Sequence, residues 1–299
     1  MIRIIIVKYS KKYLVNIIIM DNHKIDTLIL SGGGPSGIAY IGILKALVEY
    51  AIIDKSELKE IITTSVGIIF ATLYLLDYTI LQIEKIVLEY DLNNLLNMDD
   101  LEIDDLLVKF GFFSNKPIGD GISSFIRHKT DKNDITLQEL YNLCKIKLTV
   151  KVYNVDLGKT EYFNYLNNPD ISLIQLAMMT TAIPYMFQPV KYKDHLYVDG
   201  GLKGHFPIEA CSSKNYLGLN VKGGTTNPSN FELIKILPIL GYTINLMNDK
   251  GIIDAEDTKI FTYHINGGMN FSLDLKDKNT LIEKGYNMTI DYLKKNNYY

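Results

Sequence analysis

The chain has 299 residues, of which 47% are hydrophobic and 22% charged, so it can bury a large core and is not expected to be disordered. Its formal net charge of −3 argues against a nucleic-acid-binding protein, because such proteins usually carry a basic face. The two cysteines, Cys144 and Cys211, have no metal-ligand spacing and the five histidines form no metal-binding motif, so we expect reduced thiols, no metal site and no cofactor.

Residues 1–20 contain two short apolar runs separated by Lys8, Lys11 and Lys12. Neither run reaches the roughly 18 apolar residues that a membrane span needs, and no signal-peptide cleavage site is clear. We therefore interpret residues 1–20 as an appendage of unknown role and residues 21–299 as a single domain. A cytoplasmic location is expected, with peripheral contact to membranes left open.

Strand-like runs alternate with helical patterns along the rest of the chain. Strands are predicted at residues 27–30, 59–64, 147–156, 161–163, 196–198, 216–221 and 259–265. Helical patterns follow Gly37, Ser65, Thr79, Leu101, Ile118, Leu137, Ile171, Pro207, Phe231 and Thr280. This alternation is typical of a mostly parallel central sheet flanked by helices on both faces, so the predicted fold class is α/β.

A glycine-rich loop follows the first predicted strand. Gly32, Gly34 and Gly37 satisfy G-x-G-x-x-G, and such a loop at a helix N-terminus attracts either a phosphate or an oxyanion. A dinucleotide fold needs an acidic residue at the end of the second strand. Asp54 precedes that strand, which ends instead in Ser65. The loop is therefore predicted to hold an oxyanion.

The second strand ends in Thr63-Thr64-Ser65-Val66-Gly67, which is close to the G-x-S-x-G nucleophile elbow except for Thr63. Gly67 leaves space beside the serine, and the helix N-terminus favours negative charge there. The alternative is that Ser65 is only a helix N-cap. The helix that begins at Ser65 is apolar nearly all round and is predicted to be buried.

A serine nucleophile needs a base. No histidine stands convincingly after a strand, and His205 is the nearest candidate. A further strand ends in Asp199-Gly200-Gly201, which in isolation could be a surface turn.

Together these segments resemble the patatin-like phospholipase family over roughly residues 26–210. The matching stretches are SGGGPSG at 31–37, TSVG at 64–67, TTAIPYMFQPV at 180–190 and VDGGLKGHFP at 198–207. The resemblance implies a three-layer α/β/α fold and a Ser-Asp dyad without histidine, with Ser65 as nucleophile and Asp199 as base. It also implies hydrolysis of fatty acyl esters of phospholipids or neutral lipids, so the expected partner is a lipid or membrane-surface substrate.

The resemblance places the oxyanion hole in the glycine-rich loop. Pro35 has no N–H, so Gly33 and Gly34 are the preferred donors, with the N–H groups of Val66 and Ser36 as supplements. The remaining glycines of the motifs are Gly32, Gly37, Gly67, Gly200 and Gly201.

Three residues depart from the family pattern: Thr63 replaces a glycine, Ser36 replaces a basic residue and His205 replaces an asparagine. A catalytically impaired lipid-binding or scaffold protein on the same fold is therefore the alternative function, and a nucleotide-binding oxidoreductase is a more distant one. The apolar run 231–249 is either a membrane-facing element or a core helix kinked at Pro238. The acidic run 97–107 is interpreted as a capped helix start.

Overall fold

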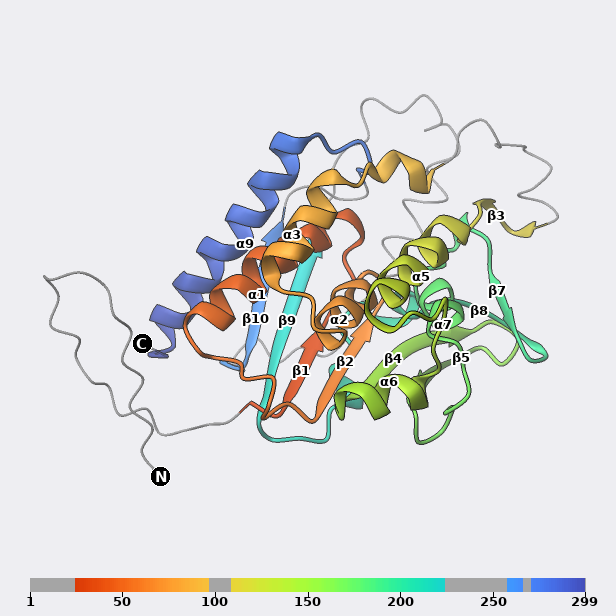
Figure 1. Ribbon diagram of the computed structural model, residues 1–299, viewed down its shortest axis with the longest axis horizontal. Helices are drawn as coiled ribbons and strands as arrows, with labels where there is room; N and C mark the ends of the chain where they lie inside the picture. Colours follow the sequence, from red (N-terminus) through yellow and green to blue (C-terminus); the bar gives the residue numbers. More distant parts are fainter. Residues whose placement is uncertain (1–24, 97–108, 224–256, 266–269, 299) are drawn as a thin grey trace, which may run out of the picture.

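A computed structural model describes residues 25–96, 109–223, 257–265 and 270–298. The centre of this part is a mixed sheet of eight strands in the order β10-β9-β1-β2-β4-β8-β7, with β5 paired to β4 (Figure 1). Its strands are β1 (Thr27–Leu30), β2 (Glu60–Thr64), β4 (Lys147–Asn154), β5 (Lys159–Phe163), β7 (Val190–Tyr192), β8 (His195–Asp199), β9 (Tyr216–Gly223) and β10 (Ile260–Ile265). A separate two-stranded sheet pairs β3 (Gly111–Phe113) with β6 (Tyr185–Phe187).

The five strands β10, β9, β1, β2 and β4 run parallel. Strands β5 and β8 pair antiparallel with β4, and β7 pairs antiparallel with β8 at the edge of the sheet. Strands β1 and β2 are buried along their whole length, which is typical of parallel strands with both faces covered. The predicted α/β class and the mostly parallel sheet are confirmed. Strands β3, β6 and β7 were not expected, because each has only three residues.

The helices are α1 (Ala39–Glu49), α2 (Gly67–Leu75), α3 (Ile80–Glu89), α5 (Lys116–Thr130), α6 (Leu137–Cys144), α7 (Leu173–Thr180) and α9 (Leu275–Lys295). The burial predicted for α2 is confirmed, but α2 begins at Gly67, two residues after Ser65. The helix expected after Pro207 is wrong, since only a 3₁₀ turn forms at Ile208–Ala210. The runs 1–20, 97–107 and 231–249 lie outside the described residues.

Alternate residues of β1 and β2 contribute to different hydrophobic clusters. Leu28, Leu30 and Ile61 join the main cluster, which includes the buried side chains of α1 and α2. Ile29 and Ile62 belong to a smaller cluster with Phe206, from the segment that contains the 3₁₀ turn. Because successive strand residues point to opposite faces, the sheet is covered on both sides.

Helix α1 follows the glycine-rich loop and packs closely against α9 (Figure 1). A Cβ added to Gly42 would lie 1.9 Å from the carbonyl oxygen of Ile282, and one added to Gly285 would lie 2.3 Å from that of Ala39. Glycine at both positions therefore permits the backbones of α1 and α9 to approach closely. Helix α9 thus supports α1, the helix that follows the glycine-rich loop. In the described part of the chain, no helix has both the length and the apolar character needed to cross a bilayer.

Candidate active site

The glycine-rich loop lies directly on the serine turn. A Cβ added to Gly32 would be 3.0 Å from Ser65 Cβ, and one added to Gly37 would be 2.7 Å from Val66 Cγ1. Gly34 has a φ of +52°, in the left-handed region that favours glycine. The loop and the predicted nucleophile, far apart in sequence order, therefore form one surface at the ends of β1 and β2.

The backbone N–H groups of this surface divide into bonded and unbonded ones. Gly32 donates to the carbonyl of His205 at 2.8 Å, and Ser36 donates to the carbonyl of Gly33 at 3.2 Å. Within the described residues, the N–H groups of Gly33, Gly34 and Val66 have no acceptor. Of the four donors expected from the sequence, Ser36 is therefore engaged, and the other three have no acceptor among the residues that the structure describes.

Ser65 occupies a strained backbone conformation, with a φ of +51°, between the end of β2 and the start of α2. A non-glycine residue in this region is uncommon, and a sharp strand-to-helix turn of this kind projects the side chain of a nucleophilic serine. Ser65 is 6% exposed. Its N–H donates to Thr180 Oγ1 at 2.9 Å. The N-cap residue of α2 is Val66, so Ser65 is not the N-cap of this helix.

Thr63 has no space to spare beside Gly67. A Cβ added to Gly67 would lie 2.2 Å from Thr63 Oγ1, and that hydroxyl is buried without a hydrogen-bond partner in the described structure. The departure from glycine at residue 63 is thus accommodated because residue 67 is glycine.

Asp199 ends β8 beside the serine turn. Strands β2 and β8 lie on opposite sides of β4. Thr64 of β2 pairs with Lys151, and Asp199 of β8 pairs with Val152, so β2 and β8 end at adjacent residues of β4. The structure therefore brings the two predicted dyad residues to one place.

The carboxyl group of Asp199 is completely buried. Its Oδ1 accepts the Gly201 N–H at 2.7 Å, and its Oδ2 has no hydrogen-bond partner in the part of the chain described. The pKa of Asp199 is raised to about 7. Burial raises it, and the Ser65 hydroxyl, the Gly201 N–H and the Lys151 ammonium offset part of that rise. The Ser65 hydroxyl is thus near the carboxyl group, although the two groups do not meet the distance and angle limits of a hydrogen bond.

His205, the alternative base, is directed elsewhere. Its Nε2 lies 2.9 Å from Oδ1 of the buried Asn220 on β9. Because that oxygen is an acceptor, Nε2 is assigned the proton. Burial lowers the pKa of His205. The contribution of His205 to the site is its backbone carbonyl, which fixes Gly32.

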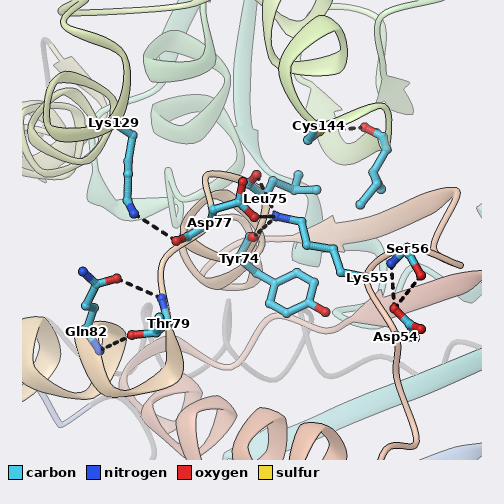
Figure 2. A network of polar contacts seen from close by, with 11 residues as sticks. Asp54, Lys55, Ser56, Tyr74, Leu75, Asp77, Thr79, Gln82, Lys129 and Cys144 are labelled. Atoms are coloured by element: carbon cyan, nitrogen blue, oxygen red, sulfur yellow. Dashed lines mark hydrogen bonds and ion pairs between the residues drawn. The ribbon is translucent and has the colours of Figure 1, made fainter.

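The far end of α2 is also held. Figure 2 shows Lys55 Nζ donating to the carbonyls of Tyr74 and Leu75, at 2.7 and 3.1 Å, beside its ion pair with Asp77. Lys129 Nζ, at the end of α5, donates to the Asp77 carbonyl at 2.9 Å. Cations at a helix C-terminus complement its dipole, so α2 is anchored at the end opposite Ser65.

Two residues that sequence reasoning missed connect the site. Thr180 Oγ1 accepts the Ser65 N–H and donates to the Lys151 carbonyl at 2.7 Å. Lys151 is 1% exposed in the middle of β4. A signal existed for both, since Thr180 opens one of the matching stretches and Lys151 interrupts an otherwise apolar strand centre.

A cavity of about 500 Å³ lies between the start of α5 and β7, with Lys116, Asp120 and Lys191 in its wall. None of the predicted site residues lines it. In the described ranges, no group of three His, Cys, Asp or Glu side chains is arranged to hold a metal ion.

Comparison with known families and structures gives this arrangement a context. The family model of the patatin-like phospholipases matches residues 28–212, which contain the glycine-rich loop, the serine turn and Asp199. The chain belongs to the patatin-like phospholipase family. The family supports lipid hydrolysis as the general activity of this chain.

Two viral proteins are similar to this chain in sequence, and two solved structures are similar to it in fold. The chain is 29% identical over 280 residues to uncharacterized protein R571 of Acanthamoeba polyphaga mimivirus, covering 89% of this chain and 93% of that protein. It is 31% identical over 183 residues to probable lipid hydrolase 463L of Invertebrate iridescent virus 6, covering 61% of this chain and 62% of that protein. The fold is similar to that of VipD from Legionella pneumophila, with a TM-score of 0.66 at 17% identity, covering 91% of this chain and 67% of VipD. It is also similar to that of ExoU from Pseudomonas aeruginosa, with a TM-score of 0.52 at 16% identity, covering 90% of this chain and 53% of ExoU.

Proposed function

We propose that this protein is a serine hydrolase of lipid acyl esters in which Ser65 is the nucleophile and Asp199 is the base. The observation that carries the proposal is the pairing of a serine in a left-handed turn with a buried carboxyl group whose Oδ2 has no partner in the described structure. Burial that raises the pKa of Asp199 to about 7 makes this carboxylate a stronger base than an exposed aspartate.

The proposed reaction has two halves. As Ser65 Oγ attacks the ester carbonyl, its proton passes to Asp199 Oδ2 and the carbonyl oxygen becomes an oxyanion beside Gly33, Gly34 and Val66. Collapse of the tetrahedral intermediate breaks the ester bond, and Asp199 returns the proton to the leaving alcohol. Water then gives a proton to Asp199 and attacks the acyl-enzyme, and the fatty acid leaves as Ser65 regains its hydrogen.

The N–H groups of Gly33, Gly34 and Val66, which have no acceptor in the described part of the chain, support an oxyanion role for the loop. These three residues are partly buried and adjoin the serine turn: Val66 follows Ser65 directly, and Gly33 and Gly34 follow Gly32, whose added Cβ would lie 3.0 Å from Ser65 Cβ. Removal of one such donor typically costs about 10²–10³-fold in kcat.

Fluorophosphonate labelling tests the proposal. Wild-type protein should become labelled at Ser65, as located by peptide mass spectrometry, and Ser65→Ala should not be labelled. The same pair should differ in fatty acid release from phosphatidylcholine vesicles and from triacylglycerol emulsions, which identifies the lipid class. Absence of labelling in folded wild-type protein would favour the alternative of a lipid-binding or scaffold protein, with Thr63 obstructing the turn.

A further inference from the structure

We infer that Lys151 is a positioning residue that ties the base Asp199 and the nucleophile Ser65 to one point of β4. The inference rests on the proposed function, and it assigns to Lys151 no contact with substrate. Two separate sets of contacts, one from the side chain and one from the backbone, converge on this residue.

The Lys151 side chain holds the turn that follows Asp199. Its ammonium group donates to the carbonyls of Lys203 and Gly204, at 2.8 and 2.9 Å, and to Glu209 Oε1 at 2.5 Å. These three acceptors use all three ammonium hydrogens. The turn 200–204 is therefore fixed by a charged group that is 1% exposed.

The Lys151 backbone holds the serine turn. Its carbonyl accepts Thr180 Oγ1 at 2.7 Å, and Thr180 Oγ1 in turn accepts the Ser65 N–H at 2.9 Å. A Cβ added to Gly200 would lie 2.4 Å from the same carbonyl, so the turn after the base packs on it directly. A displacement of Lys151 would thus move the base and the nucleophile at once.

Four ionisable groups from neighbouring elements surround Lys151, namely Asp199 from β8, His205 from the turn after it, Glu209 from the 3₁₀ turn and, through Glu209, Tyr162 from β5. The positive charge of Lys151 lowers the pKa of Asp199 and also that of His205. Since Asp199 must be ionised to accept a proton, loss of the Lys151 charge should move the acidic limb of the activity profile to higher pH.

The test compares Lys151→Met and Lys151→Arg with the matched control Lys278→Met. Lys278 is 3% exposed and its ammonium donates to the carbonyls of Val87, Leu88 and Tyr90, at the end of α3, and not to the site. Hydrolysis of a fluorogenic butyrate ester is measured from pH 5 to 9. Each reaction is stopped and its fluorescence is read at one alkaline pH, so that the signal does not depend on the reaction pH. Melting temperatures are measured in parallel.

We expect Lys151→Met to lower kcat by roughly 10- to 100-fold with little change in KM, because sub-ångström misplacement of the dyad affects the transition state most. Its acidic limb should move to higher pH, and Lys151→Arg should restore the position of the limb because it keeps the charge. Lys278→Met should lower the melting temperature without changing kcat or the limb.

Wild-type kcat and an unmoved limb in Lys151→Met would overturn the inference, as would losses equal to those of Lys278→Met. If Lys151→Met does not fold, Lys151→Arg decides: the guanidinium keeps the charge but cannot reproduce the three contacts of the ammonium, so kcat should fall while the limb stays in place, and wild-type kcat would refute the inference. A wild-type protein that is not labelled at Ser65 is a different outcome, since the proposed function then fails and the inference fails with it.

Discussion

Replacing Asp199 by asparagine should abolish ester hydrolysis and make the protein more stable above neutral pH. The carboxyl group is completely buried, and its pKa rises from the ordinary value of 3.8 to about 7, with burial as the largest cause. Between these pH values the native state keeps a proton that the unfolded chain has released, so the free energy of unfolding falls as pH rises from about 4 to about 7. Above pH 7 the native state carries the full cost of the buried charge.

The size of the effect follows from the same values. At about 1.4 kcal/mol per pH unit, a rise from 3.8 to about 7 corresponds to up to about 4 kcal/mol. Asparagine has no charge to bury, and its side-chain oxygen can still accept the Gly201 N–H that Asp199 Oδ1 accepts at 2.7 Å. We therefore expect Asp199→Asn to gain up to about 4 kcal/mol at pH 8 and less than about 2 kcal/mol at pH 5.

Urea denaturation at the two pH values measures this gain. Ser65→Ala is the matched control, since it should be equally inactive but keeps Asp199 and should show no gain at pH 8. The reasoning is refuted if Asp199→Asn has a lower free energy of unfolding than wild type at pH 8, or if the two proteins differ equally at both pH values. Either result would mean that the buried charge does not destabilise the native state.

Three further predictions concern the packing around Ser65 and between α1 and α9. Thr180→Val should lower kcat and the rate of fluorophosphonate labelling by roughly tenfold or more, because the Ser65 N–H loses its acceptor; unchanged labelling would contradict this. Gly67→Ala should cost more free energy of unfolding in wild type than in a Thr63→Ala background, since the new Cβ meets Thr63 Oγ1, and a double-mutant cycle measures the coupling. Gly42→Ala should lower the melting temperature. Its control is Gly121→Ala, whose new Cβ has no atom within 4 Å, and helix propensity should raise the free energy of unfolding of this variant by about 1 kcal/mol. Equal effects of the two substitutions would refute the close approach of α1 and α9.

The local patterns of the sequence predicted the elements with strong periodicity. The buried strands and α2 follow from their continuous apolar character, and the serine turn follows from Ser65 between an apolar strand and Gly67. The helix predicted after Pro207 did not form, and only a three-residue 3₁₀ turn is present there. Its side chains instead cover the face of the sheet that carries Ile29 and Ile62, a tertiary requirement that local propensity does not express.

The connections within the site could be predicted only in part. Motif order indicated that Ser65 and Asp199 share a place, and the register of β4 explains why they do. The role of Lys151 depends on carbonyls more than 50 residues away in sequence, and such pairings leave no local pattern. Likewise, only the three-dimensional form of the loop distinguishes the engaged N–H of Ser36 from those of Gly33 and Gly34, which find no acceptor within the described ranges.

The position of β1 in the sheet has a consequence for biosynthesis. Its neighbours are β2, which follows soon in the chain, and β9, whose first residue, Tyr216, pairs with Thr27. Ser31 Oγ also accepts the Val221 N–H, across 190 residues. At about 5–20 residues per second, a ribosome needs roughly 10–40 s to supply that second neighbour, so the nascent chain carries an unpaired apolar edge for that time. The segment that matches the family model ends at residue 212, before β9. Because this segment lacks one of the two strands that pair with β1, it should not fold by itself.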